Sequence, residues 1–408
     1  MVMKEAELQD AVVRILRGQG LAGRITNLGY FKGRAKGGRP GYREYSYRNI
    51  LTDRYDSSVI WICERFAKWE ISLLGGIKPT NISLDKLDRI YPDIIAYDEC
   101  KNFFLFELKV GSKTEREAVT ELFAYVFELR TLMPTLNNHE ISLIIISDEF
   151  GVLISHAVLQ VLSFFGMKVL CLRPENKIHL TFEIVDPLKS LGIKDYRLSD
   201  NAISVYSLSL YQHTKVSLKA NEHIEMILKV VNDMLLDRAN RLGSNGFYFL
   251  HKNERTENTC GAVATYFITI GLFDPFKLLD VPSLLLRKTN ISSFLLDIAS
   301  DHDSHLQNHF YELVREAEQF LKKFYHVTYE TPASYRQFSR ALNFSRDVIA
   351  VSCNVWGEFG EFIREILYSN KAGEDFFNEE LDHTNPFCLW EALEVVFSGH
   401  NDIDVDES

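Results

Sequence analysis

The sequence lacks the features of several protein classes. Its six cysteines are scattered, with no CxxC pair and no cluster of cysteine with histidine: Cys63, Cys100, Cys171, Cys260, Cys353 and Cys388. This spacing argues against a structural zinc site and a disulfide framework, and it fits a reducing cytoplasm. No apolar run approaches the roughly 18 residues of a membrane span, and the first residues carry charges where a secretory signal needs an apolar run. We therefore expect a soluble cytoplasmic protein without a membrane partner.

Basic residues are missing from one end of the chain and concentrated near the other. Residues 374–408 contain eleven Asp and Glu and no Lys or Arg, whereas residues 11–54 contain ten Lys and Arg against two acids. The net charge of −11 therefore hides a basic region that suits a polyphosphate. Its glycine-rich part, 33–49, predicts a loop that is either a nucleic-acid-binding arm or a plain solvated surface. The candidate binding residues are Lys32, Arg34, Lys36, Arg39, Arg43 and Arg48.

The 408 residues are enough for two or three domains. We expect an N-terminal helix at 6–16 and the basic arm within 1–55, an α/β domain over 56–190, a linker over 191–217 and a mainly α-helical domain over 218–408 that ends in a disordered acidic tail. Apolar periodicity in the α/β domain predicts helices at 56–74, 113–133 and 152–165, and strands at 90–97, 102–110, 141–147, 167–172 and 178–184. Such an order predicts a mixed sheet with helices on both faces.

The predicted strand pair contains charges where apolar residues are expected. It reads "YPDIIAYDECKNFFLFELK" from Tyr91, and alternation puts Glu107 and Lys109 on one face while Asp93 lies near the middle of the neighbouring strand. Two carboxylates at close range repel unless a proton or a cation intervenes. Mg²⁺ or Mn²⁺ suits such oxygen ligands, completed by water and a phosphate. Lys109 could then hold or deprotonate the attacking water. An ion pair of Glu107 with Lys109 on a solvated strand is the alternative.

This combination, "YPD" followed after thirteen residues by "ELK", resembles the signature of the PD-(D/E)XK nuclease superfamily, which has the restriction-endonuclease-like fold. The resemblance covers roughly residues 56–185. It implies that Asp93, Glu107 and the carbonyl of Leu108 bind the metal ion and that Lys109 is the catalytic lysine. Many members of the superfamily add an acidic residue from the helix before the hairpin.

We assign that additional acid to Glu70, which falls near the middle of the apolar arc of the helix predicted at 56–74; Glu64, at the edge of the arc, is the second choice. A salt bridge to a nearby arginine would explain Glu70 equally well. Several branches of the superfamily also have Gln-x-x-x-Tyr on the following helix. Here the matching positions are Glu121 and Tyr125, so the tyrosine is present and the glutamine contact is in doubt.

Two weaker patterns lie in the second half of the chain. Residues 333–356 have the spacing of a helix-turn-helix, which is typical of DNA-binding proteins and also of ordinary helical hairpins. His302 and His305, next to two aspartates, allow a metal site, but a solvated helix start is the simpler interpretation.

Together these patterns predict a Mg²⁺- or Mn²⁺-dependent DNA nuclease, and they leave a homo-oligomer open. The resemblance implies hydrolysis that leaves a 5′ phosphate, and a role in phage defence or DNA repair. A non-catalytic nucleic-acid-binding or assembly protein with the same fold is the alternative, and RNA stays open as a substrate.

Overall fold

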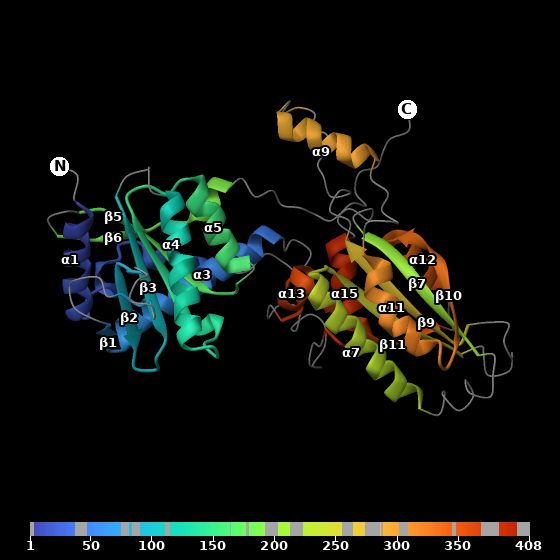
Figure 1. Ribbon diagram of the computed structural model, residues 1–408. Helices are drawn as coiled ribbons and strands as arrows, with labels where there is room; N and C mark the ends of the chain where they lie inside the picture. Colours follow the sequence, from blue (N-terminus) through green and yellow to red (C-terminus); the bar gives the residue numbers. More distant parts are fainter. Residues whose placement is uncertain are drawn as a thin grey trace. The chain divides into compact units, whose positions relative to one another are not determined.

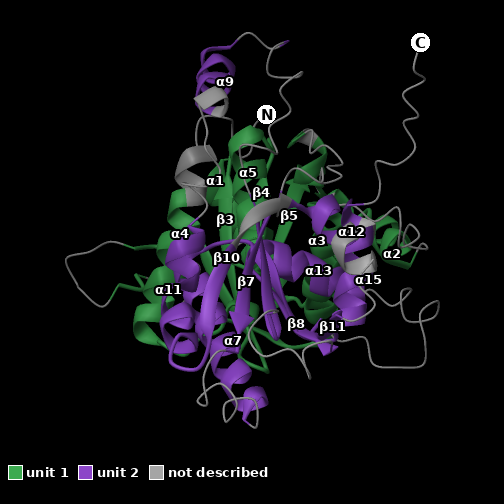
Figure 2. Ribbon diagram, turned by 90° about the vertical axis from the view of Figure 1, so that its right-hand side faces the viewer, with its two compact units in different colours: residues 1–40, 46–195 green, residues 41–45, 196–408 purple. Residues whose placement is uncertain are grey.

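The computed structural model describes residues 4–36, 47–74, 81–83, 90–110, 115–163, 165–176, 179–191, 203–212, 223–254, 264–273, 286, 289–301, 309–344, 348–368 and 383–397 (Figure 1). The chain divides into two compact units, unit 1 from residues 1–40 and 46–195 and unit 2 from residues 41–45 and 196–408 (Figure 2). Each unit has its own sheet and its own apolar core.

Unit 1 contains a six-stranded sheet in the order β1-β2-β3-β4-β5-β6. The pairs β3–β4 and β4–β5 are parallel and the other three are antiparallel, so the sheet is mixed. β4 is buried along its whole length, which explains its continuous run of isoleucine and leucine. The strands are β1 (Ile71–Leu73), β2 (Ile94–Asp98), β3 (Phe103–Lys109), β4 (Ile141–Ser147), β5 (Lys168–Pro174) and β6 (Phe182–Ile184).

Helices cover both faces of this sheet. Successive side chains of β3 point to opposite faces, and Phe104 and Phe106 contact the ring of Phe66 on α3, with centroids 4.8 and 6.1 Å apart. Lys109 points to the other face, where it contacts Glu121 on α4. α5 packs next to α4 on the same side of the sheet (Figure 1). The helices of unit 1 are α1 (Glu5–Arg17), α2 (Leu28–Lys36), α3 (Tyr47–Lys68), α4 (Glu115–Leu132) and α5 (Val152–Ser163).

The predicted α/β class with a mixed sheet is confirmed for unit 1, and two boundaries differ from expectation. The helix predicted over 56–74 begins nine residues earlier, at Tyr47, and ends at Lys68. The residues that follow form β1 and pair with β2. The predicted loop 33–49 is helical at both ends, because α2 extends to Lys36 and α3 begins at Tyr47; residues 37–46 lie outside the described part.

Unit 2 contains a five-stranded antiparallel sheet in the order β10-β7-β9-β8-β11. The prediction of a mainly helical C-terminal domain is therefore wrong. The predicted linker 191–217 is also wrong, because it contains β7 in the interior of the sheet. The strands are β7 (Ile203–Tyr211), β8 (Gly246–Asn253), β9 (Tyr266–Phe273), β10 (His326–Ser334) and β11 (Val348–Trp356).

Helices pack on both faces of the second sheet. On one face, α7 (Ile224–Leu242) and α11 (Phe310–Leu321) pack together over Leu208, Tyr248 and Ile270. On the other face, Phe249 lies 6.3 Å from Phe338 and 6.1 Å from Trp390 between ring centroids. Those two rings belong to α12 (Tyr335–Phe344) and α15 (Pro386–Phe397), and α13 (Gly357–Tyr368) packs against β11. α9 (Asn290–Asp301) precedes α11 in the chain.

Both interpretations of 333–356, the helix-turn-helix and the ordinary helical hairpin, are wrong, because α12 is followed by β11, which pairs with β8. The predicted end of a helix at Gly243 is confirmed: this glycine caps α7 with a φ of 61°, a conformation that favours glycine. His302, His305 and the acidic residues 398–408 lie outside the described residues. No helix in the described ranges has both the length and the apolar composition needed to cross a membrane.

Candidate active site

The candidate site of unit 1 lies at one end of the β2–β3 hairpin. Asp93 directly precedes β2, while Glu107 and Lys109 are among the last three residues of β3. The antiparallel register pairs Ile94 with Phe106, so it brings Asp93 opposite Glu107. Opposite positions of an antiparallel pair share a sheet face, and both carboxylates therefore lie on the face that α4 covers. The strand begins just after Asp93, whereas the sequence predicted Asp93 near its middle.

A short hydrogen bond and a close ion pair hold these side chains. The backbone N–H of Leu108 donates to Asp93 Oδ2 at 2.7 Å, and Lys109 Nζ lies 2.6 Å from Glu107 Oε1. Glu107 is 1% exposed, yet its second oxygen, Oε2, has no hydrogen-bond partner among the described residues. Burial of an unsatisfied carboxylate oxygen is unfavourable unless a ligand satisfies it. The site therefore offers one acceptor atom to a ligand.

α4 contributes two further residues, one helical turn apart. Glu121 Oε2 lies 2.8 Å from Lys109 Nζ. Tyr125 is buried, and its hydroxyl donates to the carbonyl of Tyr91 at 3.1 Å. The spacing of four residues puts Glu121 and Tyr125 on one helix face. This face points toward the carboxylates, because Glu121 contacts Lys109 of β3. Burial, followed by the negative charge of Glu107, raises the pKa of Tyr125.

α1 brings two residues that the sequence analysis missed. Gln9 Nε2 donates to the backbone carbonyl of Asp93 at 2.6 Å. Glu5 lies one turn earlier on α1, close enough for its charge to contribute to the raised pKa of Asp93. The signal was present as a Glu–Gln pair four residues apart on an amphipathic helix. However, 84 residues separate Gln9 from Asp93, and nothing local indicates that they meet.

Glu70 and Glu64 lie away from this cluster. Glu70 is exposed and follows the end of α3, and its backbone N–H donates to Glu99 Oε1 at 3.1 Å. Glu99 directly follows β2, whose five residues span roughly 16 Å, so Glu70 and Asp93 are at opposite ends of that strand. Glu64 pairs with Lys68 at 2.8 Å on the surface of α3. The expectation that one of the two joins Asp93 is wrong; the nearby helix acid is Glu5.

The electrostatics of the cluster follow from burial and crowding of like charges. Burial raises the pKa of Asp93 to about 6, although the N–H of Leu108 opposes the shift. Burial and the charge of Asp93 raise the pKa of Glu107 to about 9. Burial disfavours the Lys109 ammonium, but its bonds to Glu107 and Glu121 outweigh this effect and raise its pKa. In the metal-free protein, Glu107 therefore holds its proton to a higher pH than an ordinary glutamate does.

The donor set fits Mg²⁺ or Mn²⁺. Asp93 and Glu107 supply carboxylate oxygens, and the partnerless Oε2 of Glu107 is the kind of atom that a hard cation takes up. In the described part of the chain, no group of three or more His, Cys, Asp or Glu side chains is arranged to hold a metal ion. The set expected from the resemblance has only two carboxylates and the Leu108 carbonyl, so it is smaller than such a group. It still suits Mg²⁺, because this ion is commonly bound through one or two carboxylates while it keeps several waters.

The predicted basic residues do not gather at this cluster. Lys32 lies beside α3, where its charge acts on Cys63 and Glu64, and α3 covers the sheet face opposite Glu107. Lys36 and Arg48 are exposed. Arg39 and Arg43 are outside the described residues. The structure thus leaves three of the six cations on the surface of unit 1, with Lys32 on the side of the sheet away from the acids.

Arg34 is engaged in the interior of unit 1. Its guanidinium forms ion pairs with Asp56 of α3 and, at 2.8 Å, with Asp186 after β6. Asp56 is 1% exposed; burial raises its pKa, and the contacts with Arg34 counteract this rise. Arg34 therefore joins α2 to the rest of the unit, a structural role in place of the predicted contact with nucleic acid.

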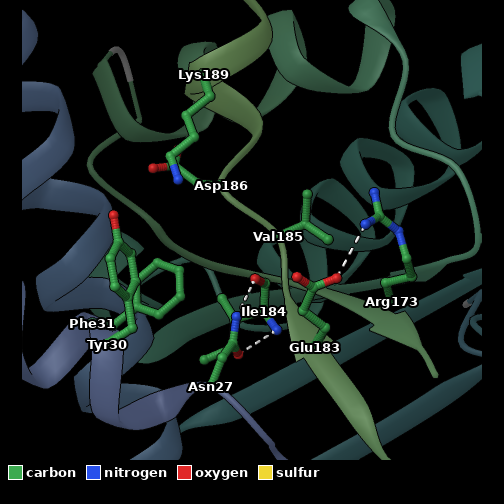
Figure 3. A pocket seen from close by; sticks show the side chains of 9 residues that line it. All are labelled: Asn27, Tyr30, Phe31, Arg173, Glu183, Ile184, Val185, Asp186 and Lys189. Atoms are coloured by element: carbon green, nitrogen blue, oxygen red, sulfur yellow. Dashed lines mark hydrogen bonds and ion pairs between the residues drawn. The ribbon is translucent and has the colours of Figure 1, made fainter. Parts of the chain in front are cut away.

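An open groove of about 370 Å³ lies beside the same ion pairs, between α2 and β6 (Figure 3). Its polar side chains are largely bonded to neighbours: Arg173 pairs with Glu183 at 3.1 Å, and the amide of Asn27 exchanges hydrogen bonds of 2.9 and 2.8 Å with the backbone of Ile184. Asn27 thus joins the start of α2 to the edge strand β6, and the Arg173–Glu183 pair lies within the sheet. We therefore regard the groove as a packing seam.

Replacing Arg34 with alanine should destabilise unit 1, because Asp56 would remain buried without its cation. We expect a loss of about 3–5 kcal/mol of unfolding free energy, measured by urea denaturation. The control is Lys36→Ala on the same helix, which should change stability by less than about 0.5 kcal/mol. An equally stable Arg34→Ala protein would contradict the structural role.

The raised pKa of Glu107 predicts a pH dependence of the metal-free protein. The folded state keeps a proton on Glu107 up to about pH 9, whereas the ordinary value is 4.5, so its contribution to stability is full below pH 4.5 and is lost as pH rises toward 9. Glu107→Gln removes this loss. In EDTA the variant should exceed wild type by about 4–5 kcal/mol at pH 8, roughly 1.4 kcal/mol per pH unit above 4.5, and come close to it near pH 5, by urea denaturation. The same difference at both pH values would refute the shift.

The described residues thus place Asp93 beside the contacting pair of Glu107 and Lys109. α4 adds Glu121 and Tyr125, and α1 adds Gln9 by a hydrogen bond and Glu5 through its charge. Neither family models, nor curated proteins, nor solved structures match this chain significantly. The interpretation of the site therefore depends on its own geometry and chemistry.

Proposed function

We propose that the chain is a metal-dependent nuclease that hydrolyses phosphodiester bonds of DNA with the acidic cluster of unit 1. The observation that carries the proposal is the contact of Lys109 with Glu107 beside Asp93, around a buried oxygen without a partner in the described residues. Such an arrangement is costly for stability alone, and it is the chemistry that a cation site for phosphoryl transfer requires.

Each side chain has a role in this proposal. Asp93 and Glu107, with the Leu108 carbonyl, would hold the ion, and the N–H of Leu108 orients Asp93. A bound divalent ion would lower the pKa of a coordinated water and stabilise charge on the phosphate. Lys109 would hold the attacking water and offset the charge that develops. Glu5 supplies the acid from a helix that the resemblance leads us to expect.

The order of elements supports the resemblance to the restriction-endonuclease-like fold. A hairpin is followed by a helix and a parallel strand, so that β2, β3, α4 and β4 follow each other in the chain, and helices cover both faces of a mixed sheet. Both acids and the lysine lie at one end of the hairpin, which matches the position of the signature in that superfamily.

DNA is the proposed substrate because a polyphosphate suits a divalent ion beside a fixed ammonium. Lys36 and Arg48 are exposed cations that could add affinity for the backbone independent of sequence, whereas Lys32 lies on the side of the sheet away from the acids. The pathway we favour is defence against phage, with unit 2 selecting the target or regulating cleavage.

The test is cleavage of supercoiled plasmid with Mg²⁺ or Mn²⁺. Asp93→Asn, Glu107→Gln and Lys109→Ala should each lower the rate by about 10²–10⁴-fold, and EDTA should abolish it reversibly. Glu70→Gln is the matched control, because it removes a carboxylate that lies near the opposite end of the hairpin, beside Glu99. This variant should cut at the wild-type rate.

Three results would change the assignment. DNA binding without cleavage under any divalent ion would favour the non-catalytic protein. Cleavage confined to an RNA panel would keep the chemistry and replace the substrate. Equal rates for wild type and Lys109→Ala would contradict the proposed site altogether.

A further inference from the structure

The Lys109 ammonium lies between two carboxylates that come from different elements. Its Nζ is 2.6 Å from Glu107 Oε1 and 2.8 Å from Glu121 Oε2. The side chain of Glu107 is 1% exposed, whereas that of Glu121 is 43% exposed. Lys109 thus has one buried and one partly solvated acceptor.

A divalent ion on Glu107 would compete with this ammonium. Both cations would need the same buried carboxylate, and at a few ångströms they would repel each other strongly in a poorly solvated site. One acceptor oxygen of Glu107 is already taken by Lys109, and only Oε2 is free of hydrogen bonds in the described residues. An ion that uses both oxygens requires Lys109 to find another partner.

Glu121 is suited to be that partner. A carboxylate accepts hydrogen bonds through both oxygens and carries a full negative charge. The glutamine expected from the resemblance would be neutral, and its amide would accept hydrogen bonds only through the oxygen while the NH₂ group donates. Glu121 already contacts Nζ, so Lys109 can leave Glu107 without leaving the site. Its position on α4, one turn before the buried Tyr125, keeps it next to Lys109.

We propose that Glu121 is a positioning residue that takes over the Lys109 ammonium when a divalent ion binds Glu107. The inference rests on the proposed function. Glu121 thereby lets the site hold an ion and a charged lysine side by side, and it keeps Nζ near the phosphate while Glu107 serves the ion. Its effect on metal affinity passes through Lys109, and direct contact with the ion is not involved.

A double-mutant cycle on Mn²⁺ affinity tests this coupling. Binding is measured by titration calorimetry on the full chain without nucleic acid, for wild type, Glu121→Gln, Lys109→Met and the double variant. Glu121→Gln should weaken Mn²⁺ binding about tenfold, a coupling of ordinary size for contacting residues, because Lys109 then stays on Glu107. Lys109→Met removes the competitor, and in that background Glu121→Gln should change affinity by less than about twofold.

The matched control is Glu128→Gln, which removes a charge from the same helix about 10 Å further along. It should leave Mn²⁺ affinity within about twofold of wild type. The kinetics give a second readout: Glu121→Gln should lower kcat at saturating Mn²⁺ with little change in KM, because the lysine is misplaced while substrate contacts remain. Circular dichroism and the melting temperature show whether every variant is folded.

The outcomes separate this inference from the proposed function. If Glu121→Gln weakens Mn²⁺ binding equally in the wild-type and the Lys109→Met backgrounds, Glu121 acts on the ion directly. This result would refute the inference and leave the proposed function standing. An unchanged affinity in Glu121→Gln would also overturn it. Wild type that binds Mn²⁺ no better than Glu107→Gln would overturn the proposed function, and the inference with it.

Discussion

The burial of two carboxylates and one ammonium at the end of a single hairpin is the constraint on which unit 1 depends. Removing such groups from water is costly, and each must be bonded or kept neutral. Asp93 is bonded by the N–H of Leu108, and Lys109 by Glu107 and Glu121. The remaining conflict is between Asp93 and Glu107, whose pKa values rise to about 6 and 9. The divalent ion of the proposed function would relieve this conflict.

The rest of unit 1 can be understood as support for that hairpin. The parallel partner β4 is buried along its length and holds β3 in the sheet. α3 packs aromatic rings on the face behind the acids, so the opposite face is left to α4 and its two polar residues. α1 contacts the start of the hairpin through the bond of Gln9 to the Asp93 carbonyl. The Arg34 ion pairs join α2 to α3 and to Asp186, which lies two residues after β6. Unit 2 has an independent core, and its sheet is covered on both faces.

Strong local patterns were interpreted correctly, and weak ones were not. The run at 141–147 matches β4 at both ends, and the helices predicted at 113–133 and 152–165 differ from α4 and α5 by at most two residues at either end. β7 was missed because the serines in "ISVYSLSLY" suggest a solvated linker, whereas pairing with β9 and β10 buries Ser204 and Ser209. The false helix-turn-helix arose because the apolar spacing of β11 also fits a short helix.

The sequence by itself determined the chemistry of the hairpin. It specifies which residues are charged, their alternation along β3, and the turn that brings Asp93 opposite Glu107, since all of these are local. The period of the apolar residues and the length of the apolar segments also determined the α/β class of unit 1. Only the tertiary structure decided which helix places an acid near Asp93, that Glu121 pairs with Lys109, that Arg34 forms ion pairs, and that unit 2 is built on a sheet. These depend on contacts between residues far apart in the chain, whose partners are selected by packing and by the need to pair buried charges.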